Sequence, residues 1–249
     1  MSSFLLAVQF LTLIPLKIKD AGEKKIAKAA AYFPLVGLLI GLVLLGINYI
    51  ISILNFPSFT SNVILVVALI ALTGGMHLDG LSDTADAFLS NKPKDEMLAI
   101  MRDPHIGVMG VLSVISVILL KIGLLAALQA PLKITALLLM CLLSRWSVVA
   151  AIFLFPYARR EGKAKIFMQG RTPGIFVLAL ISVLVFSFAI WQIKGLIALL
   201  IIAGFVYLFG RFASRKIGGI TGDTLGATIE LTEVITLLIV CITRGVIYG

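Results

Sequence analysis

Seven apolar stretches constrain the fold of this chain more than any other feature of its sequence. They lie at about 32–54, 61–76, 107–128, 134–155, 174–191, 195–210 and 231–248. A helix needs roughly 20 apolar residues to cross the hydrocarbon core of a bilayer, and most of these stretches reach or approach that length. The chain is 60% hydrophobic and 13% charged, whereas soluble domains carry about twice that share of charge. The sequence therefore predicts an all-α, polytopic transmembrane helical bundle with about seven spans.

The N-terminal segment is apolar but too short to cross a bilayer. Its apolar part, from Phe4 to Ile14, is neither preceded by a basic region nor followed by a small-residue cleavage site, as in a signal peptide. We expect a short interfacial or re-entrant helix that remains in the protein. No internal repeat or appended soluble domain is visible, so residues 1–249 are predicted to form a single integral membrane domain.

Charge is distributed unevenly between the loops. Of the 21 basic residues, 16 lie in four polar loops, at Lys17–Lys28, His77–Ile106, Pro156–Pro173 and Arg211–Glu230. The intervening short loops contain only Lys133 and Lys194. The positive-inside rule then places the polar loops in the cytoplasm and the C-terminus outside the cytoplasmic membrane. The net charge of +9 fits contact with anionic lipid and not a nucleic-acid partner.

All 12 acidic residues fall on the same side, in the polar loops or at the start of the last span. Acidic residues contribute little to topology, so their one-sided distribution needs another cause. We expect an active site that faces the cytoplasm.

The first motif that could carry chemistry is Gly-Gly-Met-His-Leu-Asp-Gly-Leu-Ser-Asp-Thr-Ala-Asp at 74–86. If it is helical, Asp79, Asp83 and Asp86 stand at i, i+4 and i+7, within about 60° of one another. Like charges on one face repel, and a divalent cation such as Mg²⁺ or Mn²⁺ compensates them directly. The alternative is a solvated helix end with three unrelated acids.

Two further motifs combine acids with glycines. In Met-Arg-Asp-Pro-His-Ile-Gly-Val-Met-Gly at 101–110, Pro104 predicts a turn before the third span, where Arg102 could hold a phosphate and Asp103 could bind metal. A plain loop is the alternative. The run 218–233 contains four glycines together with Asp223, Glu230 and Glu233. Open backbone N–H groups there suit an anion, although small-residue helix packing also explains the glycines.

Basic residues inside or near the spans are candidates for binding phosphate. Arg145 lies in the middle of a span, where arginine normally faces the protein interior and pairs with an acid or a phosphate. Lys121 is similar, but its side chain could instead reach the membrane surface. The cluster at 159–165 could bind substrate phosphates or anionic lipid.

Taken together, these motifs resemble the signature of the cobalamin synthase (adenosylcobinamide-GDP ribazoletransferase) family. The resemblance covers the runs at 74–86, 101–110 and 218–230, and also Phe-Leu-Thr-Leu-Ile-Pro at 10–15 and Phe-Pro-Leu-Val-Gly at 33–37. These blocks follow one another in the expected order along nearly the whole chain. One position departs from the pattern, because Ala87 stands where we expect glycine.

The resemblance implies a Mg²⁺-dependent reaction in which adenosylcobinamide-GDP and α-ribazole give adenosylcobalamin and GMP. With α-ribazole 5′-phosphate, the product would be adenosylcobalamin 5′-phosphate. The expected roles are Asp79, Asp83 and Asp86 for the metal; Asp86, Asp223 or Glu230 for accepting the hydroxyl proton; and His77, Arg102, Arg145, Thr221 and Gly222 for binding substrate. The partners are these two substrates and the lipid bilayer, and the sequence leaves a homo-oligomer open.

Two other functions share some of these sequence features. CDP-alcohol phosphotransferases also place acids around a metal, but their pattern requires Ala-Arg where this chain has Asp83-Thr84 after Asp79-Gly80. A cation-coupled transporter would use acids near the middle of the bilayer, commonly within inverted repeats. The sequence shows no repeat, and its acids gather at one face.

Overall fold

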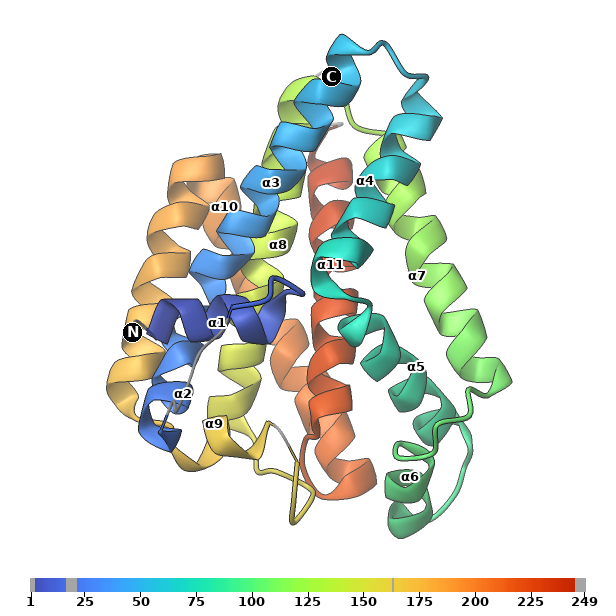
Figure 1. Ribbon diagram of the computed structural model, residues 1–249, viewed down its shortest axis with the longest axis vertical. Helices are drawn as coiled ribbons and strands as arrows, with labels where there is room; N and C mark the ends of the chain where they lie inside the picture. The colour runs from blue at the N-terminus through green and yellow to red at the C-terminus, as the bar shows by residue number, and fades with distance from the viewer. Residues whose placement is uncertain (1–2, 17–21, 163, 245–249) are drawn as a thin grey trace.

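The structure is a computed structural model that describes residues 3–16, 22–162 and 164–244, and every regular element in these ranges is a helix (Figure 1). The helices are α1 (Ser3–Leu11), α2 (Glu23–Ala29), η1 (Ala30–Tyr32), α3 (Phe33–Ile53), α4 (Ser58–Thr73), α5 (Met76–Leu89), α6 (Lys94–Ile100), α7 (Val108–Ala126), α8 (Ala130–Leu154), α9 (Lys165–Gln169), α10 (Pro173–Ile217) and α11 (Gly222–Arg244). The predicted all-α class is confirmed.

Five segments of the described chain are long and apolar enough to cross a membrane. They are Glu23–Ile53, which ends in α3, together with α7, α8, α10 and α11; α4 and α5 form a sixth only as a pair bent by 90°. We treat α4 as the spanning part of that pair, because α5 carries the acids. The 16 residues of α4 reach only about 24 Å, which is short for a span.

The long helix α10 is two antiparallel helices. Trp191 and Gln192 have non-helical backbone angles, and Gln192 has a φ of 50°. A Cβ added to Gly195 would lie 2.0 Å from the carbonyl oxygen of Ser187. In a continuous helix these residues would be about 12 Å apart, so the chain must reverse direction. With α10 counted as two spans and α4 as one, the described chain has seven candidate spans, which agrees with the predicted number.

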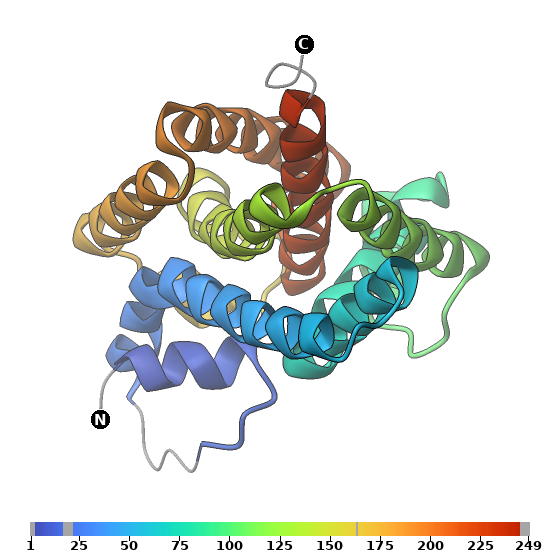
Figure 2. The same cartoon turned by 90° about the horizontal axis from the view of Figure 1, so that it is seen from above.

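The centre of the bundle is α8, which α3, α10 and α11 surround (Figure 2). Close approach between α3 and α8 depends on a missing side chain, since a Cβ on Gly37 would lie 2.1 Å from the carbonyl oxygen of Cys141. Small residues at helix crossings are typical of membrane bundles, because lipid-embedded helices associate largely through packing.

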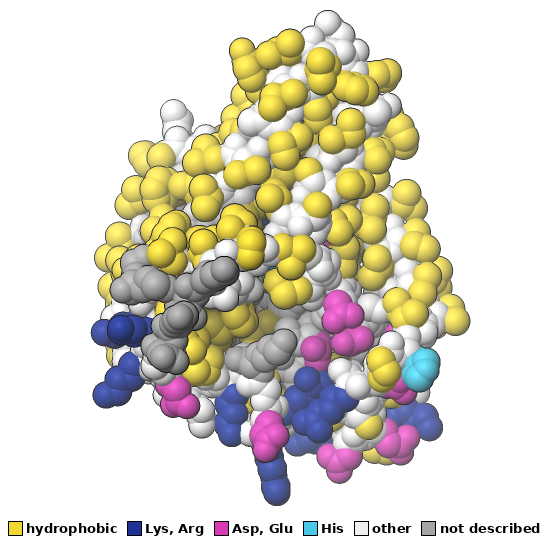
Figure 3. All heavy atoms as spheres, in the orientation of Figure 1, with side chains coloured by type: hydrophobic (Ala, Val, Ile, Leu, Met, Phe, Trp, Pro, Cys, Tyr) yellow, Lys and Arg dark blue, Asp and Glu magenta, His cyan; other side chains and the backbone are white. Residues whose placement is uncertain are grey.

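Polar residues gather at one end of the bundle. The connections that include α6 and α9 lie at the lower end in Figure 1, and the charged side chains visible in Figure 3 lie in the same half. In the upper half of that face the side chains with a type colour are hydrophobic, and the rest is other side chains and backbone. The short helix α1 runs across the bundle near the polar half, as expected for an interfacial element. The described chain ends with α11 pointing away from the polar end.

Candidate active site

Two left-handed glycines set the direction in which the acid-bearing helix leaves α4. Gly74 and Gly75 have φ values of 66° and 68°, a conformation that other residues adopt only with strain. After this 90° bend, α5 is continuous from Met76 to Leu89. The helical spacing predicted for Asp79, Asp83 and Asp86 is therefore confirmed.

The start of α11 lies directly against α5. A Cβ on Gly80 would lie 2.8 Å from the carbonyl oxygen of Asp223, and a Cβ on Gly226 would lie 3.1 Å from that of His77. The two backbones can cross this closely only because both positions are glycine. This contact brings Asp223 beside the acids of α5, although about 140 residues separate them in the chain.

Asp223 is held by a cation from a third element. The Nη2 atom of Arg159 lies 2.7 Å from the Asp223 carboxylate. An isolated bridge between Tyr157 and Ile220 joins this loop to the residues just before α11. The Thr221 hydroxyl accepts the backbone N–H of Thr224 at 3.2 Å, and the Thr224 hydroxyl accepts that of Thr221 at 2.8 Å. Thr221, expected to bind substrate, thus caps α11.

The carboxylate of Asp86 binds the N-terminus of α7. Its two oxygens accept the backbone N–H groups of Gly107 at 2.7 Å and Gly110 at 2.8 Å. A negative charge is favourable at a helix N-terminus, where N–H groups have no partner within the helix. A Cβ on Gly107 would lie 2.3 Å from Asp86 Oδ1, so this contact also depends on glycine. The roles of Asp86 as metal ligand and base stay predictions.

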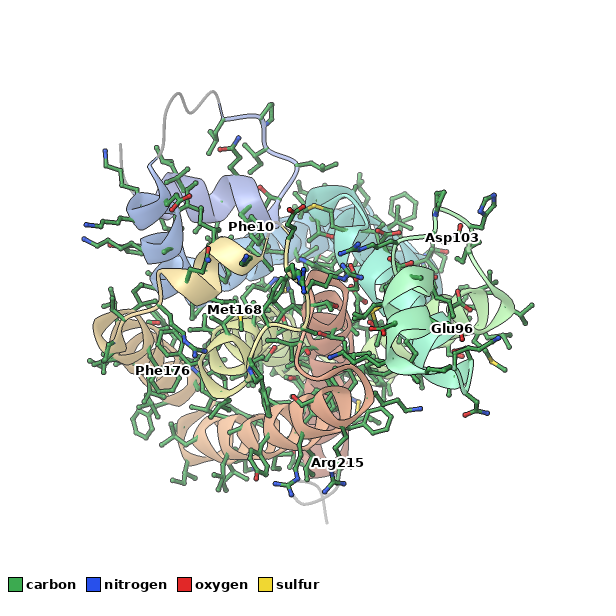
Figure 4. The ribbon with its side chains drawn as sticks, turned by 90° about the horizontal axis from the view of Figure 1, so that it is seen from below. Phe10, Glu96, Asp103, Met168, Phe176 and Arg215 are labelled. Atoms are coloured by element: carbon green, nitrogen blue, oxygen red, sulfur yellow. The ribbon has the colours of Figure 1, made fainter. Side chains whose placement is uncertain are left out.

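Three cavities lined by described residues open at the polar end of the bundle. Figure 4 shows this end of the molecule from below. The acidic cavity, about 640 Å³, lies between α5 and the α6–α7 connection and is lined by Asp79, Asp83 and Arg102. The basic cavity, about 670 Å³, lies between α6 and residues 158–161. The α1 cavity, about 510 Å³, lies between α1, α5 and the start of α11, and includes Asp79, Asp223 and Gly222 in its wall. The substrate-binding candidates Arg102 and Gly222 thus lie at open cavities.

Electrostatics at the acidic cavity disfavour several simultaneous negative charges. Burial, together with the carboxylates of Asp79 and Asp223, raises the pKa of Asp83 to about 7. Burial also raises the pKa of the Tyr157 hydroxyl. By contrast, hydrogen bonds from the backbone N–H and the ring of His105 lower the pKa of the exposed Asp103. The carboxylates around Asp83 therefore need a positively charged partner, whereas the Asp103 carboxylate already accepts hydrogen bonds from His105.

The fit of these residues to Mg²⁺ follows from donor chemistry. Within the described ranges, no three or more His, Cys, Asp or Glu side chains are arranged to hold a metal by themselves. Mg²⁺ is usually bound by one or two carboxylates and completed by water and substrate phosphate. Asp79 and Asp83 line one cavity and supply hard oxygen donors of this kind. They suit an ion that is shared with a phosphate-bearing substrate.

A separate ion network is buried within the spans. Lys121 of α7 lies 2.7 Å from the Glu230 carboxylate and also bonds to Glu233. Arg145 of α8 bonds to Glu233 and donates to Ser144 at 2.9 Å. All four charged side chains are at most 6% exposed. Two cations and two anions therefore balance one another away from water, as intramembrane charges normally must.

This network corrects several expectations. Glu230 and Glu233 do not lie at the membrane face, because α11 begins at Gly222 and not near 231, which places them about 12 and 16 Å along the helix. Arg145 and Glu230 line none of the three cavities, so their predicted roles in substrate binding and proton transfer stay untested. Lys121 does not reach the surface; it is buried and paired.

His77, another substrate-binding candidate, lies between the α1 cavity and the ion network. It is 7% exposed, contributes to the wall of the α1 cavity, and its Nδ1 atom has no hydrogen-bond partner among the residues that the structure describes.

Sequence reasoning did not single out three residues that the structure brings to the cavities. Arg159 was one of four neighbouring basic residues, Phe10 was only the first residue of the family block at 10–15, and Tyr157 belonged to no motif. All three line the α1 cavity. The only available signal for Arg159 was that Asp223 needs a positively charged partner, and the sequence does not say which basic residue supplies it.

Comparison with known proteins agrees with these features. The family model described as cobalamin-5-phosphate synthase matches residues 3–241. A Roseiflexus protein named adenosylcobinamide-GDP ribazoletransferase is 39% identical over 93% of this chain and 86% of its own length. Proteins of the same name from Caldanaerobacter subterraneus and Desulforamulus reducens are 38% and 37% identical, covering 96% and 93% of this chain and 97% and 93% of their own. No solved structure matches. This chain belongs to the cobalamin-5-phosphate synthase family.

Proposed function

We propose that this protein transfers the adenosylcobinamide-phosphate group from adenosylcobinamide-GDP to α-ribazole or α-ribazole 5′-phosphate, releasing GMP, with Mg²⁺ as the cofactor. The observation that supports this most is the meeting of Asp79, Asp83 and Asp223 with Arg102 and Arg159 around neighbouring cavities that share lining residues. Phosphoryl transfer requires positioning and charge neutralisation at such a place, with little covalent chemistry from the protein.

Different residues are assigned to different parts of the reaction. A ribose hydroxyl of the acceptor attacks the phosphorus nearer cobinamide, and the bond from that phosphorus to the oxygen bridging to GMP breaks. Of the three expected bases, Asp223 is the one that lines a cavity and is therefore best placed to take the hydroxyl proton. Arg102 and Arg159 bind phosphate oxygens as charge develops. Asp79 and Asp83 would hold Mg²⁺, which would supply Lewis-acid neutralisation of the pyrophosphate charge.

The cytoplasmic membrane is the proposed location, with the cavities facing the cytoplasm. Support comes from the concentration of basic loops at the same end as the cavities, which is the end that the positive-inside rule retains in the cytoplasm.

GMP release by the purified protein in detergent tests the proposal. With adenosylcobinamide-GDP and α-ribazole, we expect turnover that stops when Mg²⁺ is removed by chelation. Asp79→Asn and Asp83→Asn should each lower turnover by orders of magnitude, because each removes a charged oxygen donor. Glu96→Gln is the matched control, since this acid is 57% exposed and forms a surface ion pair with Lys92. Absence of GMP release by the folded wild-type protein, or near wild-type rates in both Asp variants at limiting Mg²⁺, would contradict the proposal.

A further inference from the structure

The three cavities meet around shared side chains. Asp79 lines both the acidic cavity and the α1 cavity. Arg102 lines the acidic and basic cavities, and Arg159 lines the basic and α1 cavities. A displacement at phosphorus places the attacking and leaving oxygens roughly in line, on opposite sides of the reacting group. The attacking and leaving groups therefore lie on opposite sides of the reacting phosphorus, and two cavities that share lining side chains fit this requirement.

The α1 cavity combines an apolar wall with an acidic end. Phe10 and Leu11 from α1 and Leu225 and Ile229 from α11 form part of its apolar wall. The ring of Phe10 is fixed, because it stacks on Phe33 at a centroid distance of 5.8 Å and meets Phe167 edge-on at 4.7 Å. Figure 4 shows Phe10 on α1 beside α9. Such a wall suits an aromatic base, and about 510 Å³ is within the usual range for small-molecule sites.

The α1 cavity and the basic cavity differ in the charge of the side chains that line them. The α1 cavity has two carboxylates, Asp79 and Asp223, and one guanidinium, Arg159, that is already bonded to Asp223. This surplus of negative charge favours a group that offers hydroxyls and disfavours a pyrophosphate.

The basic cavity has the opposite balance. It is lined by four basic side chains (Lys94, Arg102, Arg159 and Arg160) and two acidic ones (Asp95 and Glu161). A positive surplus of this kind suits nucleotide phosphates, which arginine binds with paired hydrogen bonds.

We infer that the α1 cavity binds the base and ribose of the acceptor, and that the basic cavity binds the nucleotide end of the donor. In this arrangement the acceptor's aromatic base lies against Phe10 and its ribose hydroxyls point toward Asp79 and Asp223. The short N-terminal helix α1 is thereby part of the acceptor site and not only a membrane-surface anchor. This inference rests on the proposed function, because it assigns the two proposed substrates to separate cavities.

Steady-state kinetics with both substrates varied test the assignment. Phe10→Leu keeps an apolar side chain but removes the ring, and we expect the KM for α-ribazole to rise roughly tenfold, the order expected for one lost base–aromatic contact. The KM for adenosylcobinamide-GDP should stay within about twofold of the wild-type value on the same reasoning. Arg160→Ala should show the reverse pattern. Phe59→Leu is the control and should change neither KM, because this exposed ring lies near the start of α4 and lines none of the three cavities.

A binding measurement keeps the assignment testable if Phe10→Leu weakens folding. Phe10→Trp preserves an aromatic wall and adds an indole whose emission should be quenched by α-ribazole but not by GMP. The same titration of Phe59→Trp should show no α-ribazole-dependent change. Equal KM changes for both substrates in Phe10→Leu, or no specific quenching in Phe10→Trp, would overturn the assignment while wild-type turnover continued. Loss of wild-type turnover itself would instead contradict the proposed function.

Discussion

Lys121→Met should destabilise the protein far more than loss of an ordinary lysine. Lys121 is 3% exposed and is the partner that Glu230 shares with Glu233. Its removal leaves two buried carboxylates with Arg145 as the remaining cation of the network. Removing one member of a buried ion pair costs about 3–5 kcal/mol, because the remaining charge stays desolvated.

Thermal unfolding in detergent micelles, followed by circular dichroism, measures this effect. About 1 kcal/mol corresponds to roughly 2–4 °C in Tm for a chain of this size, so Lys121→Met should lower Tm by about 6–20 °C. The control is Lys92→Met, because Lys92 pairs with Glu96 at 3.3 Å on the surface with both side chains more than half exposed. Loss of such a pair costs about 1 kcal/mol or less.

A double variant separates charge balance from simple loss of packing. Lys121→Met combined with Glu230→Gln leaves Arg145 and Glu233 as a neutral pair. The double variant should therefore be more stable than the sum of the two single effects predicts, by at least about 1 kcal/mol. Additive effects, or a Tm for Lys121→Met equal to that of the control, would show that these side chains do not form one coupled network.

Three other predictions concern the site and the topology. Gly80→Ala should lower turnover at least tenfold while the protein still inserts, because the new Cβ would lie 2.8 Å from the backbone oxygen of Asp223. Gly123→Ala is the control and should match wild type, because its Cβ would meet no described neighbouring atom within 4 Å. Equal rates in the two variants would refute the close crossing of α5 and α11. Asp86→Asn should cost about 1.5–3 kcal/mol in unfolding experiments, since a charged acceptor for two N–H groups at the start of α7 is lost; an unchanged Tm would contradict this role. A reporter that works only in the cytoplasm should be inactive when fused to the C-terminus, and an active fusion would reverse the proposed orientation.

Local patterns in the sequence were enough to predict the spans and the register of the acids on α5. Apolar runs mark helices by length alone, and the spacing of Asp79, Asp83 and Asp86 defines one face of any helix that contains them. Small-residue packing was one explanation for the glycines of 218–233, and the close contact of Gly80 and Gly226 between α5 and α11 agrees with it.

Pairings between distant helices could not be predicted in the same way. Lys121 and Glu230 are 109 residues apart, and nothing in either span specifies which helix will be its neighbour. The beginning of α11 was also misplaced, because its glycines and acids look like a loop when they are read without their partners. In the sequence, Arg159 and Arg160 look equivalent. What directs Arg159 toward Asp223 is its place two residues after Tyr157, whose bridge to Ile220 is a tertiary contact.

The ion network has a consequence for how the chain is made. The cations Lys121 and Arg145 enter the membrane with α7 and α8, whereas both neutralising carboxylates come from α11, the last helix to be synthesised. At about 5–20 residues per second, the 109 residues between Lys121 and Glu230 correspond to a delay of roughly 5–20 s. During that interval a nascent chain holds uncompensated cations at the translocon or in lipid. A chain truncated before α11 would keep them uncompensated, and we expect such a chain to be retained in the membrane less well than one that includes α11.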